Sequence, residues 1–151
     1  MNTSFTVAAH ILGYLAWRKS SGEDWTSSIE LGKSINTHSV VVRRVLSKLH
    51  SHGLIETRRG PSGGSRLAKP AHSIHLEDVY GAVVPQDSSL IHFGDNEHSK
   101  CDIGIHIEAV LRDIVADSER VFRKRLRQTS IAEFSKRVVS RLGCCSPDTD
   151  E

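Results

Sequence analysis

Two groups of basic residues lie close together in the middle of the sequence. Arg43, Arg44 and Lys48 occur at helical spacing, and three further arginines surround a glycine-rich stretch a few residues later. Arginine can contact guanine through a bidentate pair of hydrogen bonds, and lysine can bind a phosphate. From the first of these residues to Lys69 the only acid is Glu56, so the positive charge is local although the net charge of the chain is only +2. This pattern predicts a surface that meets a polyanion such as DNA.

The glycine-rich stretch predicts a β-hairpin with arginines near its tip. Residues 54–58 are typical of a strand, residues 60–64 read Gly-Pro-Ser-Gly-Gly, and residues 65–68 form a returning strand. Glycines allow a tight turn and a close approach of the backbone to a phosphate, and arginine suits a narrow minor groove. A nucleotide-binding loop needs a Lys-Ser or Lys-Thr pair that opens a helix, which this turn lacks, so an NTPase is excluded.

The elements before this hairpin predict a helix-turn-helix. Residues 3–19 have apolar positions three and four apart, and Ser27 or Ser28 can cap a second helix that ends at the turn 36–38. A third helix over 39–52 directs Val42, Val45, Leu46 and Leu49 toward a core and leaves its arginines and Lys48 on the opposite face. Three helices followed by a hairpin make a winged helix-turn-helix, within a mainly α fold that has one small β-hairpin.

The second half of the chain predicts a long, partly uncovered helix. A short helix over 74–84 completes a DNA-binding domain that spans residues 1–84, and residues 85–101 are expected to form a loop. From Asp102 to about Arg127 apolar residues recur at helical spacing over roughly 38 Å, which is too long for one small domain to cover. A last helix is expected from Thr129 to Leu142, so residues 102–142 are assigned to a long dimerisation helix and a short helix, and residues 143–151 to a disordered tail.

One cysteine stands at a position that favours thiol chemistry. Cys101 precedes the long helix, whose N-terminal dipole stabilises a thiolate, and Lys100 adds positive charge. A packed, inert cysteine is the alternative. A metal or cluster site could also combine Cys101 with nearby histidines. These are His92, His98 and His106, with His10 approaching through the fold.

Several classes of protein are excluded or not expected. No apolar run reaches the ~18 residues that span a membrane, and the apolar start of the chain has no basic leader or cleavage pattern, so a cytoplasmic protein is expected. The chain has three cysteines, an odd number, and their spacing is not that of a disulfide-rich secreted protein, so such a protein is not expected. The sequence has no Cys-x-x-Cys pair, so a structural zinc finger is not expected either. No catalytic grouping is evident, so neither an enzyme nor a cofactor is expected.

Several segments together resemble a known family. The turn Arg-Gly-Pro-Ser-Gly-Gly (59–64) and the segment Ile-His-Leu-Glu-Asp-Val (74–79) are similar to the Rrf-two (Rrf2) family of bacterial transcription regulators. The segment Asn-Thr-His-Ser-Val-Val-Val-Arg-Arg (36–44) and Lys-Cys-Asp-Ile-Gly (100–104) are most similar to its YwnA-like branch, which has a single cysteine before the dimerisation helix. The resemblance covers nearly the whole chain, from about residue 4 to 138.

The resemblance implies a homodimer whose long helices cross, whose third helix enters the major groove and whose wing arginine, here Arg59, contacts the minor groove. Cluster-binding members have three cysteines in the loop before the long helix, whereas this chain has only Cys101 there. Ser62 and Ser65 also depart from the usual turn, replacing a glycine and an aromatic residue. The expected DNA-binding residues are His38, Ser39, Val40, Arg43, Arg44, Lys48, Arg58, Arg59, Ser62, Gly63 and Arg66.

The sequence therefore predicts a sequence-specific transcriptional regulator that binds a palindromic operator in double-stranded DNA as a homodimer. We expect it to repress transcription and to respond to oxidants or electrophiles through Cys101. The alternative is an iron–sulfur or metal-dependent sensor with a cluster shared across the dimer. A third hypothesis is an interaction module whose basic face contacts an acidic protein.

Overall fold

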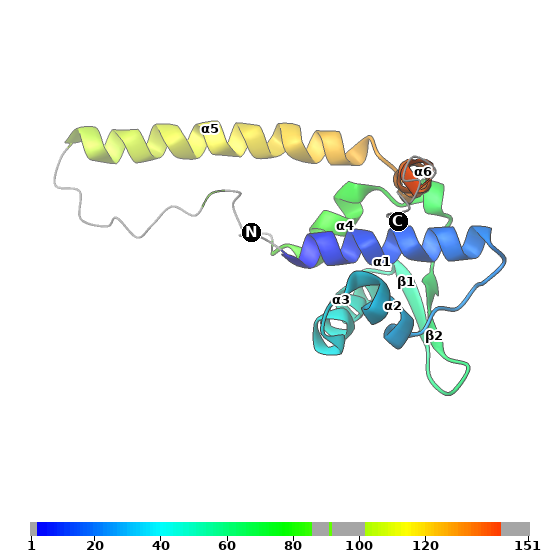
Figure 1. The fold of residues 1–151 in the computed structure, drawn as a ribbon. Coiled ribbons are helices and arrows are strands. Elements are labelled where there is room, and N and C mark those ends of the chain that lie inside the picture. The colour runs from blue at the N-terminus through cyan, green and yellow to red at the C-terminus, as the bar shows by residue number, and fades with distance from the viewer. Residues whose placement is uncertain (1–2, 86–90, 92–101, 143–151) are drawn as a thin grey trace, which may run out of the picture.

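The computed structural model describes residues 3–85, 91 and 102–142, and Figure 1 shows their arrangement. In chain order the elements are α1 (Thr3–Ser20), α2 (Ser28–Ile35), α3 (Ser39–Ser51), β1 (Ile55–Arg58), β2 (Gly64–Leu67), the 3-10 helix η1 (Ala71–Ser73), α4 (Leu76–Val83), α5 (Asp102–Arg127) and α6 (Ile131–Leu142). The two strands pair antiparallel, with Ile55 opposite Leu67 and Arg58 opposite Gly64. This arrangement confirms the mainly helical fold with a small hairpin that the sequence predicts.

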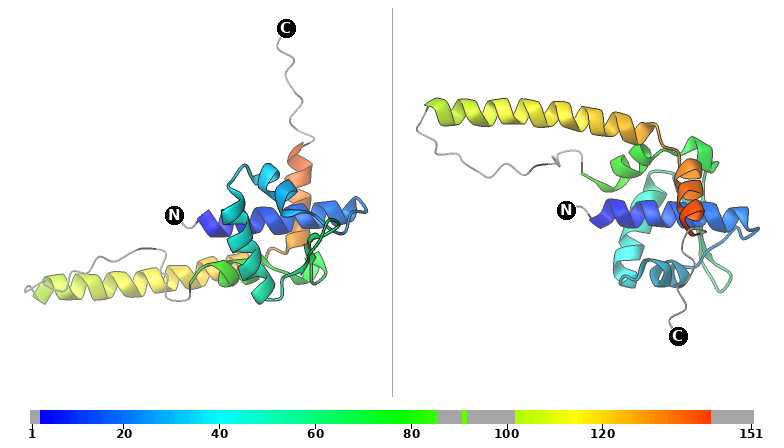
Figure 2. Two further views of the ribbon diagram at one scale, coloured as in Figure 1. Left: turned by 90° about the horizontal axis from the view of Figure 1, so that it is seen from below. Right: turned by 45° about the horizontal axis from the view of Figure 1, so that its top comes forward.

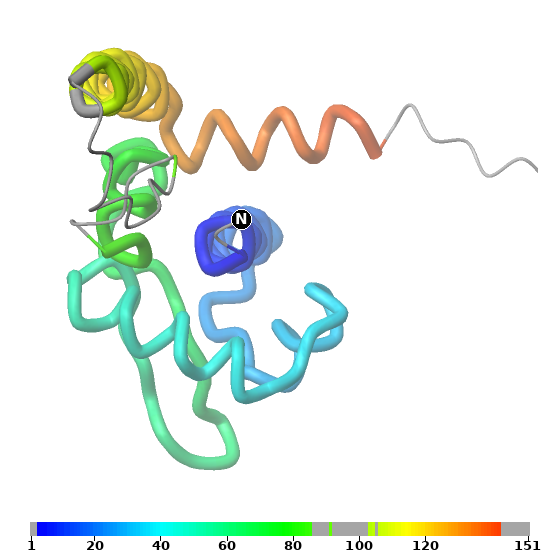
Figure 3. The backbone as a smooth tube through the Cα atoms, turned by 90° about the vertical axis from the view of Figure 1, so that its left-hand side faces the viewer, coloured from blue at the N-terminus to red at the C-terminus, as the bar shows by residue number. Residues whose placement is uncertain are grey.

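Helix α1 is the centre of the hydrophobic core. Its residues Ala8, Ile11 and Leu12 are fully buried, because α2 and α3 pack against one side of the helix while α4 and α6 pack against others. In Figures 1 and 3 α1 runs through the middle of the molecule, with α2, α3 and the hairpin on one side and α5 and α6 on the other. The four apolar residues expected to face the core from α3 are all buried.

The ends of the first helices follow the signals in the sequence. The side chain of Ser27 caps α2 by accepting a hydrogen bond of 3.1 Å from the backbone N–H of Glu30. Helix α2 ends at Ile35, and Asn36, which follows it, has a left-handed φ of 53° that allows the chain to turn toward α3. Gly53 follows α3 with a φ of 64°, as expected for a glycine just beyond a helix end.

Helix α6 begins two residues later than the sequence predicts. Thr129 and Ser130 form a short antiparallel bridge with the segment before α4 instead of a first helical turn. The N–H of Leu76 donates to Thr129 O at 3.0 Å, and the N–H of Ile131 donates to Ile74 O at 2.8 Å. These bonds fix the α5–α6 junction to the DNA-binding part of the chain, and Ile131 is fully buried.

Helix α5 extends away from the other helices over 26 residues (Figure 2), and its bounds match the prediction. Near its C-terminal end Phe122 contacts Tyr80 of α4 edge to face, with ring centroids 5.4 Å apart. Along the rest of the helix an apolar stripe at helical spacing is exposed. This α5 stripe consists of Ile103, Ile107, Val110, Leu111, Ile114 and Val121.

Part of the sequence-based interpretation lies outside the described residues. The expected loop falls almost wholly there, as do Cys101 and the expected tail 143–151. The division of the chain into a DNA-binding domain, a loop, a dimerisation part and a tail therefore stays a prediction.

Candidate nucleic-acid interface

The N-terminal half of α3 presents the residues that the sequence singles out for base contacts. Val40, Arg43 and Arg44 are exposed on the face opposite the buried stripe, and Val40 keeps 61% of its surface exposed. The guanidinium of Arg43 folds back along the helix and donates to Ser39 Oγ at 3.1 Å. His38 and Ser39 are also exposed at the start of the helix. This end of α3 has the size and the donors that a major groove accepts.

Lys48 differs from its sequence-based expectation of an outward-facing side chain. It is half buried, and its ammonium group donates to Val83 O at 3.1 Å. Val83 is the last residue of α4, so Lys48 satisfies a carbonyl at a helix end that has no partner within the helix. This bond fixes α3 against α4 and positions the helix rather than extending its basic face.

The tip of the hairpin is a compact turn with Arg59 on its surface. Arg59 and Ser62 are exposed, and Gly60 has a φ of 105°, which favours glycine. At Gly63 a β-carbon would lie 2.3 Å from Arg58 O, so only glycine fits between the two arms of the turn. Arg58 also donates to Ser62 O across the turn. The turn is therefore closed by backbone contacts, which leave the Arg59 side chain at its edge.

The base of the hairpin is joined to the segment between α1 and α2. Thr26 pairs with Ser65 through two backbone hydrogen bonds, of 3.0 Å from Thr26 N–H and 2.8 Å from Ser65 N–H. A β-carbon at Gly64 would lie only 2.5 Å from Thr26 O, so the third chain segment can approach this closely because residue 64 is glycine. The wing is thus held by a strand-like contact with the link before α2.

Trp25 holds two of the expected DNA-binding arginines. The guanidinium of Arg58 lies 4.5 Å from the centre of the Trp25 ring, and that of Arg66 lies 4.7 Å from it. Arg66 also forms ion pairs with Asp24 at 2.9 Å and with Glu56 at 2.8 Å, and these hydrogen bonds raise its pKa. Arg66 therefore acts within the protein, as a link between the wing and the α1–α2 segment. The sequence analysis missed Trp25, for which the only available signal was an aromatic residue next to Asp24.

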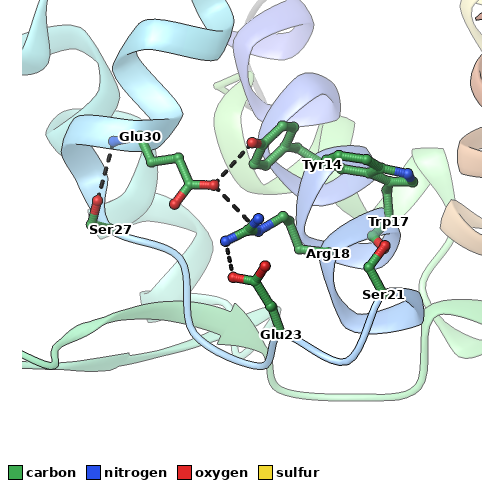
Figure 4. Close-up of polar contacts among 7 residues, drawn as sticks. All are labelled: Tyr14, Trp17, Arg18, Ser21, Glu23, Ser27 and Glu30. Carbon is green, nitrogen blue, oxygen red and sulfur yellow. Dashed lines mark hydrogen bonds and ion pairs between the residues drawn. The ribbon is translucent and has the colours of Figure 1, made fainter.

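A second set of polar contacts sets the position of α2 relative to α1 (Figure 4). Tyr14 of α1 donates a hydrogen bond of 2.9 Å to Glu30 of α2. The pKa of the Tyr14 hydroxyl is raised, mainly by burial and also by this hydrogen bond. Arg18 pairs with the same Glu30 carboxylate, with Nε 3.2 Å from Oε1, and also with Glu23 in the link. The carboxylate of Glu30 thus joins the first two helices through two side chains of α1.

These elements place two basic surfaces on one side of the molecule. In Figure 1 α3 and the tip of the hairpin both lie below α1, on the side away from α5 and α6. Arg43 and Arg44 come from the helix, and Arg59 comes from the wing. An exposed helix for the major groove beside a basic hairpin for the neighbouring backbone or minor groove is the arrangement of a winged DNA-binding domain.

The part of the chain that the structure describes has no metal centre beside this surface. Among residues 3–85, 91 and 102–142 no three side chains of His, Cys, Asp or Glu gather closely enough to hold a metal ion. Of the candidate ligands, His106 is exposed on α5 and His10 is half-buried on α1, whereas His92, His98 and Cys101 lie outside the described residues. None of the described helices is both long enough and apolar enough to span a membrane.

Comparison with known proteins agrees with this geometry over most of the chain. The model of the family described as "Rrf2: Iron-dependent Transcriptional regulator" matches residues 1–137. The candidate HTH-type transcriptional regulator YwnA of Bacillus subtilis (strain 168) is 32% identical over 133 residues, which cover 88% of this chain and 95% of that protein. The HTH-type transcriptional regulator IscR of Cereibacter sphaeroides is 36% identical over 69 residues, or 46% of this chain and 44% of that one.

Solved structures of similar proteins have the same fold. A candidate transcriptional regulator from Lactobacillus plantarum superposes with a TM-score of 0.74 at 25% identity, and the match covers 91% of each chain. CymR of B. subtilis, described as the global cysteine regulator, superposes with a TM-score of 0.61 at 20% identity over 90% of this chain and 95% of that one. The second likeness is evidence of the fold alone.

Proposed function

The chain belongs to the Rrf2 family of transcriptional regulators, and from this premise we propose that it is a homodimeric repressor of a palindromic operator. The observation that carries the proposal is the pairing of an exposed α3 N-terminus with an arginine-tipped wing on one side of the molecule. Regulators of transcription are not enzymes, and this chain is accordingly a DNA-binding protein rather than a catalyst.

Support for a homodimer comes from the α5 stripe. Six large apolar side chains are exposed along one face of that helix, with Ile107 at 55% and Ile114 at 56% exposure. Apolar side chains at this spacing are typical of a helix that packs against another helix. A second copy of α5 would cover them. The two-fold axis between the copies would then present two α3 helices to half-sites about one helical turn, roughly 34 Å, apart, which makes the operator palindromic.

Within the interface we assign different roles to the arginines. Arg43 and Arg44 read bases in the major groove together with His38, Ser39 and Val40, and Arg59 enters the minor groove with the turn residues Ser62 and Gly63 close to the phosphates. Arg58 and Arg66 act on DNA chiefly by positioning the wing, since Trp25 and two carboxylates already contact them. Lys48 positions α3 in the same way.

The proposed repression requires no contact beyond those with the operator. A dimer that covers two half-sites blocks polymerase wherever the operator overlaps a promoter. A reporter promoter that carries the operator should therefore be silenced by the wild-type protein and released by Arg59→Ala. Activation of the reporter by the wild-type protein would contradict the proposed sign of regulation.

The experiment that tests the proposal selects binding sites from a random duplex library and then measures binding curves. We expect a palindromic sequence, steep weakening of binding with salt and retained sequence preference. Arg59→Ala should weaken binding on all duplexes, because a wing contact carries little sequence information. Arg43→Ala should change the preference at one position of each half-site, by about 1–3 kcal/mol. Unchanged affinity and preference in both variants would overturn the assignment of the interface.

The proposed signal acts at Cys101, which precedes α5 in the sequence. A peroxide would oxidise its thiolate to a sulfenic acid and be reduced to water. A change at the start of α5 would alter the crossing of the two long helices and so the separation of the two wings. Mass spectrometry after mild peroxide, paired with DNA binding, tests this step. A Cys101→Ser protein that still releases DNA under peroxide would contradict it.

The second candidate is an iron-dependent or cluster-dependent regulator, because the family description names iron. The donor groups on the described residues do not fit such a site, since no three of them gather there. A cluster would therefore have to be shared across the dimer, by Cys101 and histidines. Anaerobically purified protein with stoichiometric iron and absorbance between about 320 and 450 nm would favour this candidate.

A further inference from the structure

An apolar groove lies between α1 and α6, on surfaces that the proposed DNA contacts and the α5 stripe leave unused. Its volume is about 570 Å³, within the range of small-molecule sites. Helix α1 forms one wall, α6 forms the other, and Ser34 of α2 closes one edge. The residues that line it are Phe5, Thr6, Ala9, His10, Gly13, Tyr14, Trp17, Ser34, Phe134, Ser135, Val138, Val139 and Leu142.

Two contacts at Gly13, one with Ser135 and one with Phe134, hold α1 and α6 at a fixed separation. The hydroxyl of Ser135 donates to Gly13 O at 3.2 Å, which ties α6 directly to the backbone of α1. A β-carbon at Gly13 would lie 2.9 Å from the ring of Phe134, so the absence of a side chain there lets the ring approach α1. The floor of the groove is thus built by close packing and does not depend on a ligand for its shape.

The lining determines the chemistry of an occupant. Tyr14 and Trp17 lie side by side with ring centroids 5.4 Å apart, and Phe134 adds an aromatic ring from the opposite wall. No Asp, Glu, Lys or Arg is among the lining residues, so a formal charge on a ligand would find no counter-charge there. The apolar side chains at the rim of the groove are exposed to solvent, with Val138 at 47% and Leu142 at 65% exposure, and a ligand would cover them.

One edge of the groove carries a polar pair that can orient a ligand. His10 Nε2 lies 2.9 Å from Ser34 Oγ. Partial burial lowers the pKa of His10, which keeps the imidazole neutral and able to donate or accept. A hydroxyl or carbonyl on the ligand would therefore meet neutral hydrogen-bonding groups at this edge and aromatic surface elsewhere.

We propose that this groove binds a small, uncharged aromatic molecule that carries one hydrogen-bonding group directed at His10 and Ser34. The site contacts the helix-turn-helix directly, because Ser34 belongs to α2 and Tyr14 donates to Glu30 of the same helix. It also contacts α6, whose first residues follow α5 and are fixed to the segment before α4. A bound molecule therefore changes the position of α2 relative to α1 and α6, and with it the affinity for DNA. This last step rests on the proposed function, whereas binding itself does not.

The test measures binding and DNA release separately on the full chain. Calorimetry with 2-naphthol should give one molecule bound per chain. Naphthalene, which lacks the hydroxyl, and 2-naphthalenesulfonate, which is an anion, should each bind at least threefold more weakly. Val139→Phe fills the groove from an exposed position and should weaken 2-naphthol binding at least tenfold. Lys136→Phe, an exposed position of the same helix outside the groove, should leave binding unchanged. Ser34→Ala should weaken 2-naphthol binding severalfold and naphthalene binding much less.

The second measurement titrates the selected operator duplex with and without 2-naphthol. We expect the probe to change operator affinity at least threefold in the wild-type protein and not in Val139→Phe. Binding without a change in DNA affinity would keep the site and overturn its coupling to α2. No binding of any of the three probes would overturn the site, whether or not the protein binds its operator. Dissociation of the dimer in Val139→Phe but not in Lys136→Phe would also overturn it, since the groove would then hold a second copy of this chain.

Discussion

The DNA-binding part of the chain and α5 differ in how their apolar side chains are covered. From α1 to α4 most large apolar residues are buried against each other, with Ile11, Leu31, Leu49 and Val79 among the fully buried side chains. The exceptions are Trp17, Ile29 and Val40, which are exposed. Along α5 most residues of the same types are exposed. The exceptions are Val115, which is buried, and the part near Phe122, where α4 covers the helix. The comparison shows that the first part is complete within one chain, whereas α5 needs a surface from elsewhere.

The double substitution Ile107→Glu and Ile114→Glu should separate the proposed dimer. Two carboxylates in a helix–helix contact would lose their hydration without gaining partners. Analytical ultracentrifugation should give a monomer, and operator affinity should fall more than a hundredfold, because a single half-site remains. The matched control is Ala109→Glu, an exposed position of α5 outside the stripe. A dimer that survives the double substitution would show that α5 is covered in another way.

The substitution Gly64→Val should detach the wing from the α1–α2 link. The added side chain would begin 2.5 Å from Thr26 O, so the pairing of Thr26 with Ser65 would have to open. We expect a loss of about 1–3 kcal/mol in the free energy of unfolding and a fall in operator affinity of about tenfold. Urea unfolding and binding curves measure the two effects. Gly81→Ala is the control, since nothing lies within 4 Å of a β-carbon there. It should leave operator affinity unchanged and should not lower the free energy of unfolding, because alanine favours the helix more than glycine does.

The substitution Trp25→Leu should loosen the wing without removing a DNA contact. It removes the ring beneath Arg58 and Arg66, and each stacking contribution at an exposed site is worth about 0.5–1 kcal/mol. Operator affinity should fall about threefold to tenfold, with sequence preference unchanged. Trp25→Tyr keeps an aromatic face and should restore most of the affinity. Equal losses in both variants would assign the effect to the shape of the indole rather than to stacking.

The smallest effect concerns the protonation of His10, which lies at the edge of the groove between α1 and α6. Burial lowers the pKa of His10 in the folded protein, so the unfolded chain binds this proton first as the pH falls below the ordinary value of about 6.5. His10 therefore lowers stability progressively below that pH and has no such effect at pH 8. Urea unfolding at pH 8 and pH 5.5 should show a slightly larger loss in the wild type than in His10→Gln. An equal loss of unfolding free energy between pH 8 and pH 5.5 in the two proteins would contradict a lowered pKa of His10.

Much of the fold follows from local signals. The buried positions of α3, the serine cap of α2, the left-handed Asn36 and the extent of α5 are all determined by periodicity and by single residues at helix ends. The start of α6 also has a local signal, because Ser130 caps the helix by accepting a hydrogen bond of 3.2 Å from the N–H of Glu133. The backbone pairing of this junction with the segment before α4 could not be predicted from the sequence, because the two segments are distant along the chain.

In the candidate interface, too, some features follow from the local sequence and others depend on tertiary contacts. The exposed residues at the start of α3 and at the hairpin tip are where the sequence pattern puts them, because exposure on one side follows from burial on the other. Lys48 and Arg66 have partners within the protein that the sequence pattern does not show, because Val83 O in one case and Asp24 with Glu56 in the other approach them only in the folded chain. Trp25 was missed for the same reason, since its partners lie more than thirty residues away along the sequence.

The sequence by itself determined the element order, the basic character of the hairpin tip and the uncovered apolar face of α5, since each depends on residues that are neighbours along the chain or one helical turn apart. The tertiary structure alone decided which basic side chains remain available and which hold the wing and α3 in place. It also decided that α1 and α6 enclose a groove beside His10 and Ser34. These features depend on contacts between elements that are distant in sequence, and a periodic pattern contains no information on which surfaces will meet.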